Sequence, residues 1–169
     1  MKIFISLSSP RLVQEEYTGD SGLYSAVVPD EVACRMIAKL AKAFGYEIDP
    51  SDLHCTVMYS AEKCPKQAAC DSNTQYPARF TKVQHWVGHD DKGYLTVGLS
   101  SPALTAEHNR LKKLGCEASF DYSPHITLYS GVDLTEELSQ KIKRLSAKVA
   151  QWPEIQLSNQ FIGNCKPDA

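Results

Sequence analysis

The chain has 169 residues, which fits one domain of ordinary size with a hydrophobic core of its own. Apolar residues make up 43% and charged residues 22%, so the composition disfavours the disordered and fibrous classes. The formal net charge of −2 at pH 7 indicates no strongly basic surface. Because long nucleic acid is held through basic side chains that displace counterions, we expect a phosphate ligand to be small or held locally.

The chain shows no sign of export or of a membrane anchor. A membrane-spanning helix needs about 20 apolar residues, and no stretch of the sequence approaches that length. The apolar run at residues 3–7 stops before Pro10 and Arg11, too early for a signal peptide. The six cysteines show neither a Cys-x-x-Cys pair nor zinc-type spacing. We therefore expect free thiols in a cytoplasmic protein, and no metal or other cofactor.

The first half of the chain predicts a strand, a helix and a second strand. Residues 21–28 are β-branched and aromatic enough for a strand, and a Pro-Asp pair then ends it. Apolar residues recur at three- and four-residue spacing from 32 to 44, which is the pattern of one helical face. Residues 53–59 predict the second strand. The segment 60–77 has no periodicity and predicts an exposed loop.

The second half repeats this order after an added strand. Strands at 79–88 and 94–99 flank a hairpin turn sequence, a capped helix follows at 101–115, and residues 125–129 predict the next strand. The order strand, helix, strand therefore occurs twice in one chain. We expect an α+β fold with a weak internal duplication.

The chain ends with one further helix and strand. An apolar stripe predicts the helix at 135–152, and residues 154–162 predict the strand.

Each half carries a His-x-Thr tripeptide on its second predicted strand, His54 with Thr56 and His125 with Thr127. Because side chains two apart on a strand share a face, the histidine and threonine of each motif project together. One such tripeptide is common by chance. Two of them, each after a helix and each soon followed by a Tyr-Ser pair, indicate one shared site.

Two histidines and two threonines suit phosphodiester chemistry. One imidazole can accept a proton from an attacking hydroxyl, and the other can deliver a proton to the leaving oxygen. The hydroxyls of Thr56 and Thr127 can bond the non-bridging oxygens, where negative charge builds up. No metal is required. A zinc site made from the two histidines is an alternative, but no nearby Asp, Glu or Cys has convincing ligand spacing.

The paired motifs resemble the signature of the 2H phosphoesterase superfamily over residues 21–163. Within it, several segments are similar to the bacteriophage anti-CBASS phosphodiesterases: Gly22-Leu23-Tyr24, residues 52–60, His85-Trp86, residues 99–102 and residues 120–128. Those enzymes degrade the cyclic oligonucleotide messengers of bacterial antiphage immunity. The resemblance implies a two-lobed α+β fold, with antiparallel sheets from two pseudo-symmetric halves around a central cleft and helices outside. It also implies metal-independent cleavage of cyclic di- and trinucleotides, such as 3′,3′-cGAMP, in the cytoplasm of the infected host.

Three further residues gain a role from this resemblance. Tyr24 and Trp86 would contact nucleobases, and Glu154 would supply a carboxylate from a C-terminal segment that closes over the ligand. From the residues alone, both aromatics could be core side chains and Glu154 a solvated one. His85, His89 and His108 have no matching threonine and are interpreted as surface histidines or histidines with satisfied hydrogen bonds.

The resemblance also sets the expected organisation. We expect a single domain over 1–169, with an N-terminal extension at 1–20, a first half at 21–77, and a second half at 78–169 that ends in the lid-like segment. The ligands would be cyclic di- and trinucleotides. We expect no long nucleic acid, no membrane and no obligate protein partner.

The sequence leaves the identity of the initial base open. In a 3′–5′ linkage, one histidine would deprotonate the ribose 2′-hydroxyl and the other would protonate the leaving 5′-oxygen. Two alternatives use the same residues. The first is hydrolysis of RNA 2′,3′-cyclic phosphates, and the second is a protein that sequesters cyclic nucleotides without cleaving them.

Overall fold

The computed structural model describes residues 17–19, 22–64, 68–118 and 121–165, without the side chains of Lys63 and Cys165. In chain order the elements are β1 (Gly22–Pro29), α1 (Glu31–Ala43), the 3₁₀ turn η1 (Pro50–Asp52), β2 (Cys55–Lys63), β3 (Tyr76–Val87), β4 (Gly93–Ser100), α2 (Pro102–Lys113), β5 (His125–Ser130), α3 (Glu136–Val149) and β6 (Ile155–Cys165). Every strand pair in this part of the chain is antiparallel. The predicted α+β class and antiparallel pairing are confirmed.

The helices begin where the sequence predicts, because each has a side chain that accepts the first free backbone N–H groups. Asp30 accepts from Ala33 N at 2.7 Å at the start of α1. Ser101 and Thr135 accept in the same way, three residues ahead, at the starts of α2 and α3. Each cap ends a strand or loop and directs the chain into a helix.

The predicted loop at 60–77 is wrong at both ends. β2 continues to Lys63, which pairs with Gly22 of β1, and β3 already begins at Tyr76, which pairs with Leu157 of β6. Both extensions depend on partner strands far away in the sequence. Local periodicity does not reveal such pairing, since the backbone groups that stabilise it belong to other segments.

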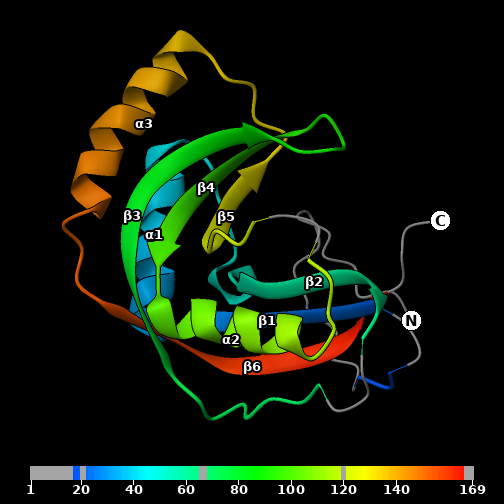
Figure 1. Ribbon diagram of the computed structural model, residues 1–169. Helices are drawn as coiled ribbons and strands as arrows, with labels where there is room; N and C mark the ends of the chain where they lie inside the picture. Colours follow the sequence, from blue (N-terminus) through cyan, green and yellow to red (C-terminus); the bar gives the residue numbers. More distant parts are fainter. Residues whose placement is uncertain (1–16, 20–21, 65–67, 119–120, 166–169) are drawn as a thin grey trace.

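The six strands close into one sheet in the order β1-β2-β5-β4-β3-β6 (Figure 1). The ring has two sides of three consecutive strands each. β6-β1-β2 contains the strand of the first motif, with β6 contributed by the second half of the chain, and β5-β4-β3 contains the strand of the second motif. The sides meet at two narrow seams in the described residues: β2 pairs with β5 at Cys55 and Ile126, and β3 pairs with β6 at three positions. The last strand of the chain therefore lies between β1 and β3.

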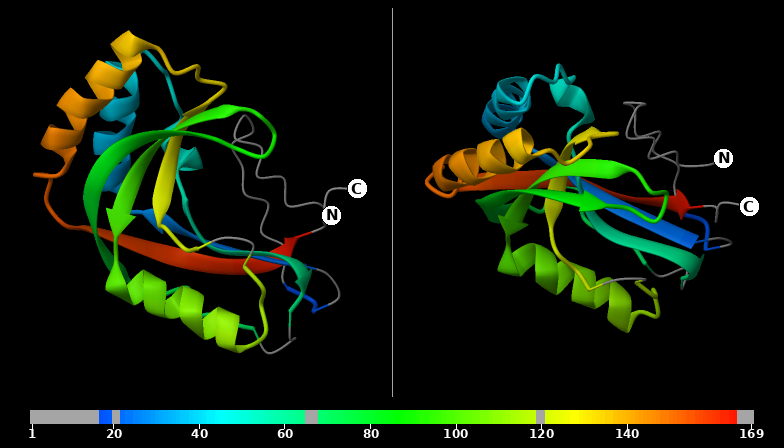
Figure 2. Two further views of the ribbon diagram at one scale, coloured as in Figure 1. Left: turned by 45° about the horizontal axis from the view of Figure 1, so that its top comes forward. Right: turned by 90° about the horizontal axis from the view of Figure 1, so that it is seen from above.

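The helices lie on the outside of this sheet. Figure 1 and Figure 2 show α3 against β3, and α1 and α2 on opposite sides of the strands. Each of these two helices reaches a His-x-Thr strand of the other half, since α1 contacts β5 and α2 contacts β2. No helix in the described residues is long and apolar enough to cross a membrane.

The two strand-helix-strand units also end their helices alike. Gly45 after α1 and Gly115 after α2 have φ values of +92° and +101°, a left-handed conformation that favours glycine. The next backbone N–H in each case donates to a carbonyl five residues earlier, that of Ala41 at 3.0 Å and of Leu111 at 3.2 Å. The two helices α1 and α2 therefore end with the same hydrogen-bond pattern.

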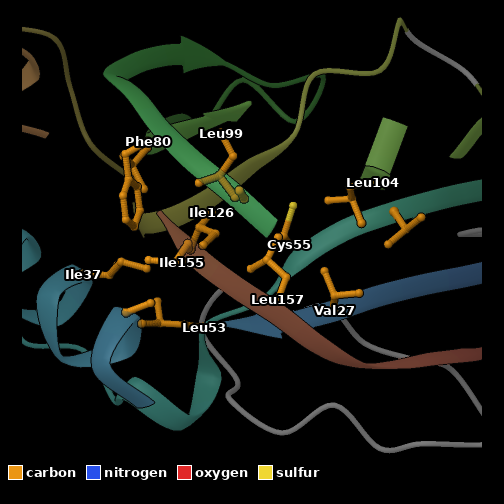
Figure 3. Packing of buried hydrophobic residues seen from close by; sticks show 14 of the residues in the cluster. Val27, Ile37, Leu53, Cys55, Phe80, Leu99, Leu104, Ile126, Ile155 and Leu157 are labelled. Carbon is orange, nitrogen blue, oxygen red and sulfur yellow. The ribbon is translucent and has the colours of Figure 1, made fainter. Parts of the chain in front are cut away.

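The core surrounds the seam between β2 and β5. Cys55 and Ile126, the middle residues of the two His-x-Thr motifs, are 0% exposed. Figure 3 shows them near Ile155 and Leu157 of β6, with Ile37 of α1 on the same side. Burial of these side chains fixes which face of β2 and β5 points inward, so the alternate residues point to the other face.

The predicted N-terminal extension at 1–20 lies outside the described residues apart from its last part. There the Tyr17 hydroxyl donates to the carbonyl oxygen of Cys64 at 2.5 Å, and Thr18 N donates to the Asn164 side chain at 3.1 Å. These bonds attach the end of the segment to residues near the ends of β2 and β6.

Candidate active site

The four His-x-Thr side chains share one face of a two-strand pair. Cys55 lies opposite Ile126 in the antiparallel pairing of β2 with β5. Continuing this register by one residue each way brings His54 beside Thr127 and Thr56 beside His125. Directly opposed residues on antiparallel strands have Cβ atoms about 4.5–5.5 Å apart. The predicted convergence of the two motifs therefore follows from the pairing, with the local two-fold axis at the buried seam.

Both histidines are held by the same hydrogen bond. His54 Nδ1 lies 2.9 Å from the carbonyl oxygen of Asp52, and His125 Nδ1 lies 2.9 Å from that of Ser123. Because a carbonyl oxygen only accepts, Nδ1 carries the hydrogen in each ring. In the neutral imidazole, Nε2 then has a free lone pair, and in the cation it carries a proton. Each Nε2 is thereby left for proton transfer.

The pKa of His54 is affected by its burial and by the neighbouring His125. Burial lowers the pKa of His54 below its ordinary value, the hydrogen bond to the Asp52 carbonyl opposes this, and the nearby His125 lowers it further. A second positive charge beside His125 is therefore disfavoured. Burial therefore favours the neutral form of the His54 imidazole.

Two tyrosines fix the position of Thr56. The Tyr24 hydroxyl lies 3.1 Å from the Thr56 hydroxyl, and the Tyr122 hydroxyl donates to the Thr56 backbone carbonyl at 2.9 Å. Burial raises the pKa of Tyr122, so its hydroxyl remains a donor. Burial also raises the pKa of the Cys55 thiol to about 12, and this inert thiol is no nucleophile.

A cavity of about 740 Å³ opens beside His125. Its lining comes from β2, the β3–β4 hairpin, α2 and the segment before β5: Thr56, Val57, Met58, Tyr59, Gln84, Trp86, Val87, Gly88, His89, Asp90, Tyr94, His108, Ala118, Asp121, Tyr122, Ser123 and His125. The described part of this lining contains two aspartates and neither lysine nor arginine. An anion in the cavity would therefore be met by neutral donors and histidines.

Aromatic rings form one wall of the cavity. Trp86 is 40% exposed and stacks on Tyr94 with ring centroids 4.6 Å apart. Its ring is edge-on to the His125 imidazole at a centroid distance of 6.0 Å. The Tyr94 hydroxyl donates to the Asp90 carboxylate at 2.5 Å, and this bond holds the stack against the hairpin tip. The wall offers an indole surface close to a candidate acid or base.

The other predicted ligand residues lie in different surroundings. Tyr24 is 0% exposed and does not line the cavity, although its hydroxyl contacts Thr56. Glu154 precedes β6, where its carboxylate lies 3.9 Å from Arg79 Nε, and it is also absent from the lining. The structure therefore places Trp86 in the cavity lining with Thr56 and His125, while His54 and Thr127 are not part of that lining. Tyr24 contacts Thr56 from behind, and Glu154 lies outside the cavity.

The sequence did not indicate that His108 and Tyr122 pack together behind Thr56. The buried His108 of α2 stacks on Tyr122 with centroids 4.2 Å apart, and its Nδ1 lies 2.7 Å from the carbonyl oxygen of Val57. The interpretation of His108 as a satisfied histidine is confirmed. Its hydrogen bond also joins α2 to β2 behind the site, a contact that no local pattern in the sequence indicated.

The strands that flank the two motifs differ. On β4, Thr96 lies opposite Thr127 and Gly98 lies opposite His125. On β1, Ala26 lies opposite Thr56, and the same register places Val28 opposite His54. The Thr96 hydroxyl is buried and has no hydrogen-bond partner among the described residues. One half thus has small or polar residues beside its motif, and the other has apolar ones.

Among the described residues, no group of three or more His, Cys, Asp or Glu side chains is arranged to hold a metal ion.

Comparison with protein families gives one match. The family described as anti-CBASS protein Acb1 matches residues 21–158 of the chain. This range contains both His-x-Thr motifs and every residue that lines the cavity. No curated protein matches the chain.

Proposed function

The chain belongs to the anti-CBASS protein Acb1 family, and we propose that it is a phosphodiesterase that hydrolyses the 3′–5′ bonds of cyclic di- and trinucleotides, such as 3′,3′-cGAMP. Family membership links the chain to evasion of CBASS immunity and to the cyclic oligonucleotide signals of that system. One observation carries the enzymatic part of the proposal. Two histidines with matching Nδ1 hydrogen bonds lie at the pairing of β2 with β5, where His125 and Thr56 line a cavity.

His54 is the initial base in this proposal, and His125 is the initial acid. Burial lowers the pKa of His54, so its Nε2 lone pair is available at neutral pH. His125 lines the cavity, where its Nε2 can deliver a proton to a leaving oxygen. This assignment rests on the different surroundings of two otherwise matching side chains.

The reaction needs two proton transfers and one displacement at phosphorus. His54 Nε2 takes the proton of the ribose 2′-hydroxyl, and the 2′-oxygen attacks phosphorus in line with the 5′-oxygen. The P–O5′ bond breaks as protonated His125 gives its proton to that oxygen, which leaves a 2′,3′-cyclic phosphate. With the histidine roles exchanged, water then opens this ring. Thr56 and Thr127 donate to the non-bridging oxygens.

We also propose that the two halves are pseudo-symmetric lobes of the 2H phosphoesterase type. The matching strand order on both sides of the ring, the equal helix ends and the two-fold pairing of the motifs support this. The site would act on the messenger in the cytoplasm of the infected host.

The test is turnover of 3′,3′-cGAMP, followed by mass spectrometry, for the wild-type chain and for His54→Ala and His125→Ala. Each variant is expected to lose about 10²–10⁴-fold in turnover, which is the usual contribution of a general acid or base. Thermal melting checks that both variants remain folded. EDTA is expected to leave the rate unchanged, and the pH profile is expected to be bell-shaped with an acid limb below about pH 6.5.

Three results would contradict the proposal. Full turnover by both alanine variants would remove the histidines from the chemistry. Recovery of unchanged cGAMP from a tight complex with the wild-type chain would indicate a sequestering protein. Faster hydrolysis of an oligonucleotide 2′,3′-cyclic phosphate than of cGAMP would favour the RNA-end reaction, which the lack of lysine and arginine in the cavity lining argues against.

A further inference from the structure

Gln84 lines the same cavity as His125, one of the two proposed catalytic histidines. The sequence did not predict a role for it. It is on β3 opposite Thr96, which in turn lies opposite Thr127. Its side chain lines the cavity and is half-buried. These three residues and His54 therefore form one row across four neighbouring strands, and Gln84 is at the cavity end of that row.

The amide group of Gln84 points back toward His125. Gln84 Nε2 lies 3.8 Å from the position that a Cβ atom of Gly98 would occupy. Gly98 is the direct cross-strand partner of His125. Because opposed Cβ positions are about 4.5–5.5 Å apart, the amide lies within reach of a group that His125 contacts.

A β-bulge and a glycine make this approach possible. Between Phe80 and Val83 the register of β3 against β4 shifts, so two residues of β3 face the single residue Gly98. A Cβ atom at Gly98 would lie 2.5 Å from Thr81 Oγ1, far inside ordinary contact distance. The glycine therefore leaves room for the Thr81 side chain over β4, and the Gln84 amide lies at ordinary contact distance from the same position.

The side-chain amide of Gln84 differs in its hydrogen bonding from the other polar side chains that line the cavity. Within the described residues Gln84 makes no side-chain hydrogen bond, although an amide has two donor hydrogens and an acceptor oxygen. Tyr94, Tyr122 and His108 each already bond a carboxylate or a backbone carbonyl. The amide donors of Gln84 are therefore available to a ligand in the cavity.

Among the described residues, the lining of the cavity offers an anion no lysine or arginine side chain. Asp90 and Asp121, which also line it, make the cavity unfavourable for an anion. A phosphodiester carries a full negative charge, so neutral donors must stabilise it there. An amide N–H that bonds an anionic oxygen forms a stronger bond than one between neutral groups.

We propose that Gln84 is a phosphate-binding residue, whose Nε2 donates a hydrogen bond to a non-bridging oxygen of the phosphodiester held between the two histidines. This inference rests on the proposed function for the position of the phosphate. Gln84 then complements Thr56 and Thr127 as a third neutral donor. Its contact is with the phosphate, so its effect does not depend on the bases of the cyclic nucleotide.

The experiment measures binding and turnover of 3′,3′-cGAMP, cyclic di-AMP and cyclic di-GMP. Gln84→Met keeps the length of the side chain and removes the donor, and Gln84→Glu keeps the shape and adds a negative charge. Binding is measured by calorimetry in a His54→Ala background, which separates binding from cleavage. Gln151→Glu, an exposed glutamine beyond α3, is the matched charge control.

Gln84→Met is expected to weaken binding of all three nucleotides about 10-fold, and Gln84→Glu about 100-fold. The control is expected to match its parent, and thermal melting checks the fold of each variant. Unchanged affinity in both Gln84 variants would overturn the inference, and so would a loss confined to one nucleobase, which would make Gln84 a base-reading residue.

The two proposals fail in different ways. If the wild-type chain binds the nucleotides but cleaves none of them, the proposed hydrolysis fails, and the binding series still decides the role of Gln84. If wild type cleaves them and the Gln84 variants bind like their parent, only the role of Gln84 fails. Absence of binding by every variant would overturn both.

Discussion

The two halves of the molecule carry the same His-x-Thr motif in opposite surroundings. In the first half, Tyr24 is fully buried, packs against Phe161 at a centroid distance of 5.8 Å, and directs its hydroxyl to Thr56. In the second half, Tyr94 directs its hydroxyl to Asp90 and supports the exposed Trp86. One half is filled, and the other opens into the 740 Å³ cavity.

The shared motif and the different surroundings of the two halves have different consequences for the site. In the proposed function, the shared motif and its paired strands supply the proton-transfer groups that a phosphodiester with an attacking and a leaving oxygen requires. The surroundings differ, because the cavity opens beside His125 and burial lowers the pKa of His54. The comparison leads to three predictions beyond the tests described above.

The largest effect is expected from the aromatic side chains that distinguish the halves. Trp86→Ala should weaken binding of 3′,3′-cGAMP by about 1–3 kcal/mol, since it removes a stacking surface for a base. Tyr24→Phe should leave binding nearly unchanged and lower turnover by about 0.5–1.5 kcal/mol in activation free energy, because Thr56 loses a hydrogen bond. Calorimetry and steady-state kinetics measure the two effects.

Trp152→Phe is the control for loss of an indole, because Trp152 packs edge-on against Phe80 and does not line the cavity. It should leave binding unchanged. A larger loss of affinity in Tyr24→Phe than in Trp86→Ala would reverse the assignment of filled and open halves.

A smaller effect is expected from the strand residues beside the motifs. Thr96→Val removes a buried hydroxyl without a partner among the described residues and keeps the shape, so the free energy of unfolding should rise by about 1 kcal/mol. Ala26→Thr makes the reverse change in the first half and should lower it by about 1–3 kcal/mol. Denaturant unfolding measures both. A less stable Thr96→Val would show that the hydroxyl has a partner, and the two halves would then be more alike than described.

The smallest effect is the pH dependence of stability that follows from the buried His54. Its pKa in the folded chain is lowered by burial, whereas in the unfolded chain it is about 6.5. Below that pH the unfolded chain binds a proton that the folded chain does not, so the free energy of unfolding falls as pH decreases. Between pH 7.5 and 5, the melting temperature of wild type should fall by more than that of His54→Gln. Equal decreases in the two proteins would show that His54 is not selectively kept neutral by the fold.

Most local elements could be predicted from the sequence because their signals are local. Asp30, Ser101 and Thr135 are helix caps by residue type and position, and the apolar spacing after each one predicts its helix. The His-x-Thr spacing likewise predicts that each histidine and threonine share a face, since strand geometry alone requires it. The two motifs could be recognised before their strands were known to pair.

Other features could not be predicted because they depend on contacts between distant segments. Nothing near Ser60 shows that β2 continues along β1, and nothing near Ile155 shows that β6 joins β1 to β3. Tyr24 was predicted as a ligand contact and is 0% exposed, with its ring against Phe161 of the distant strand β6 and its hydroxyl beside Thr56. The positions of Gln84 and His108 depend on a bulge and on helix packing, which have no short sequence signature.

The sequence by itself determined the helices, most of the strands, and the four motif residues with their shared faces, because caps, periodicity and alternation act within a few residues. Only the tertiary structure decided that β2 and β5 meet at Cys55 and Ile126, that the cavity opens on the side of His125, and that His54 is the more buried imidazole. These depend on which distant strands pair and which side chains fill the space between them. A motif repeated in the sequence becomes one asymmetric site through that packing.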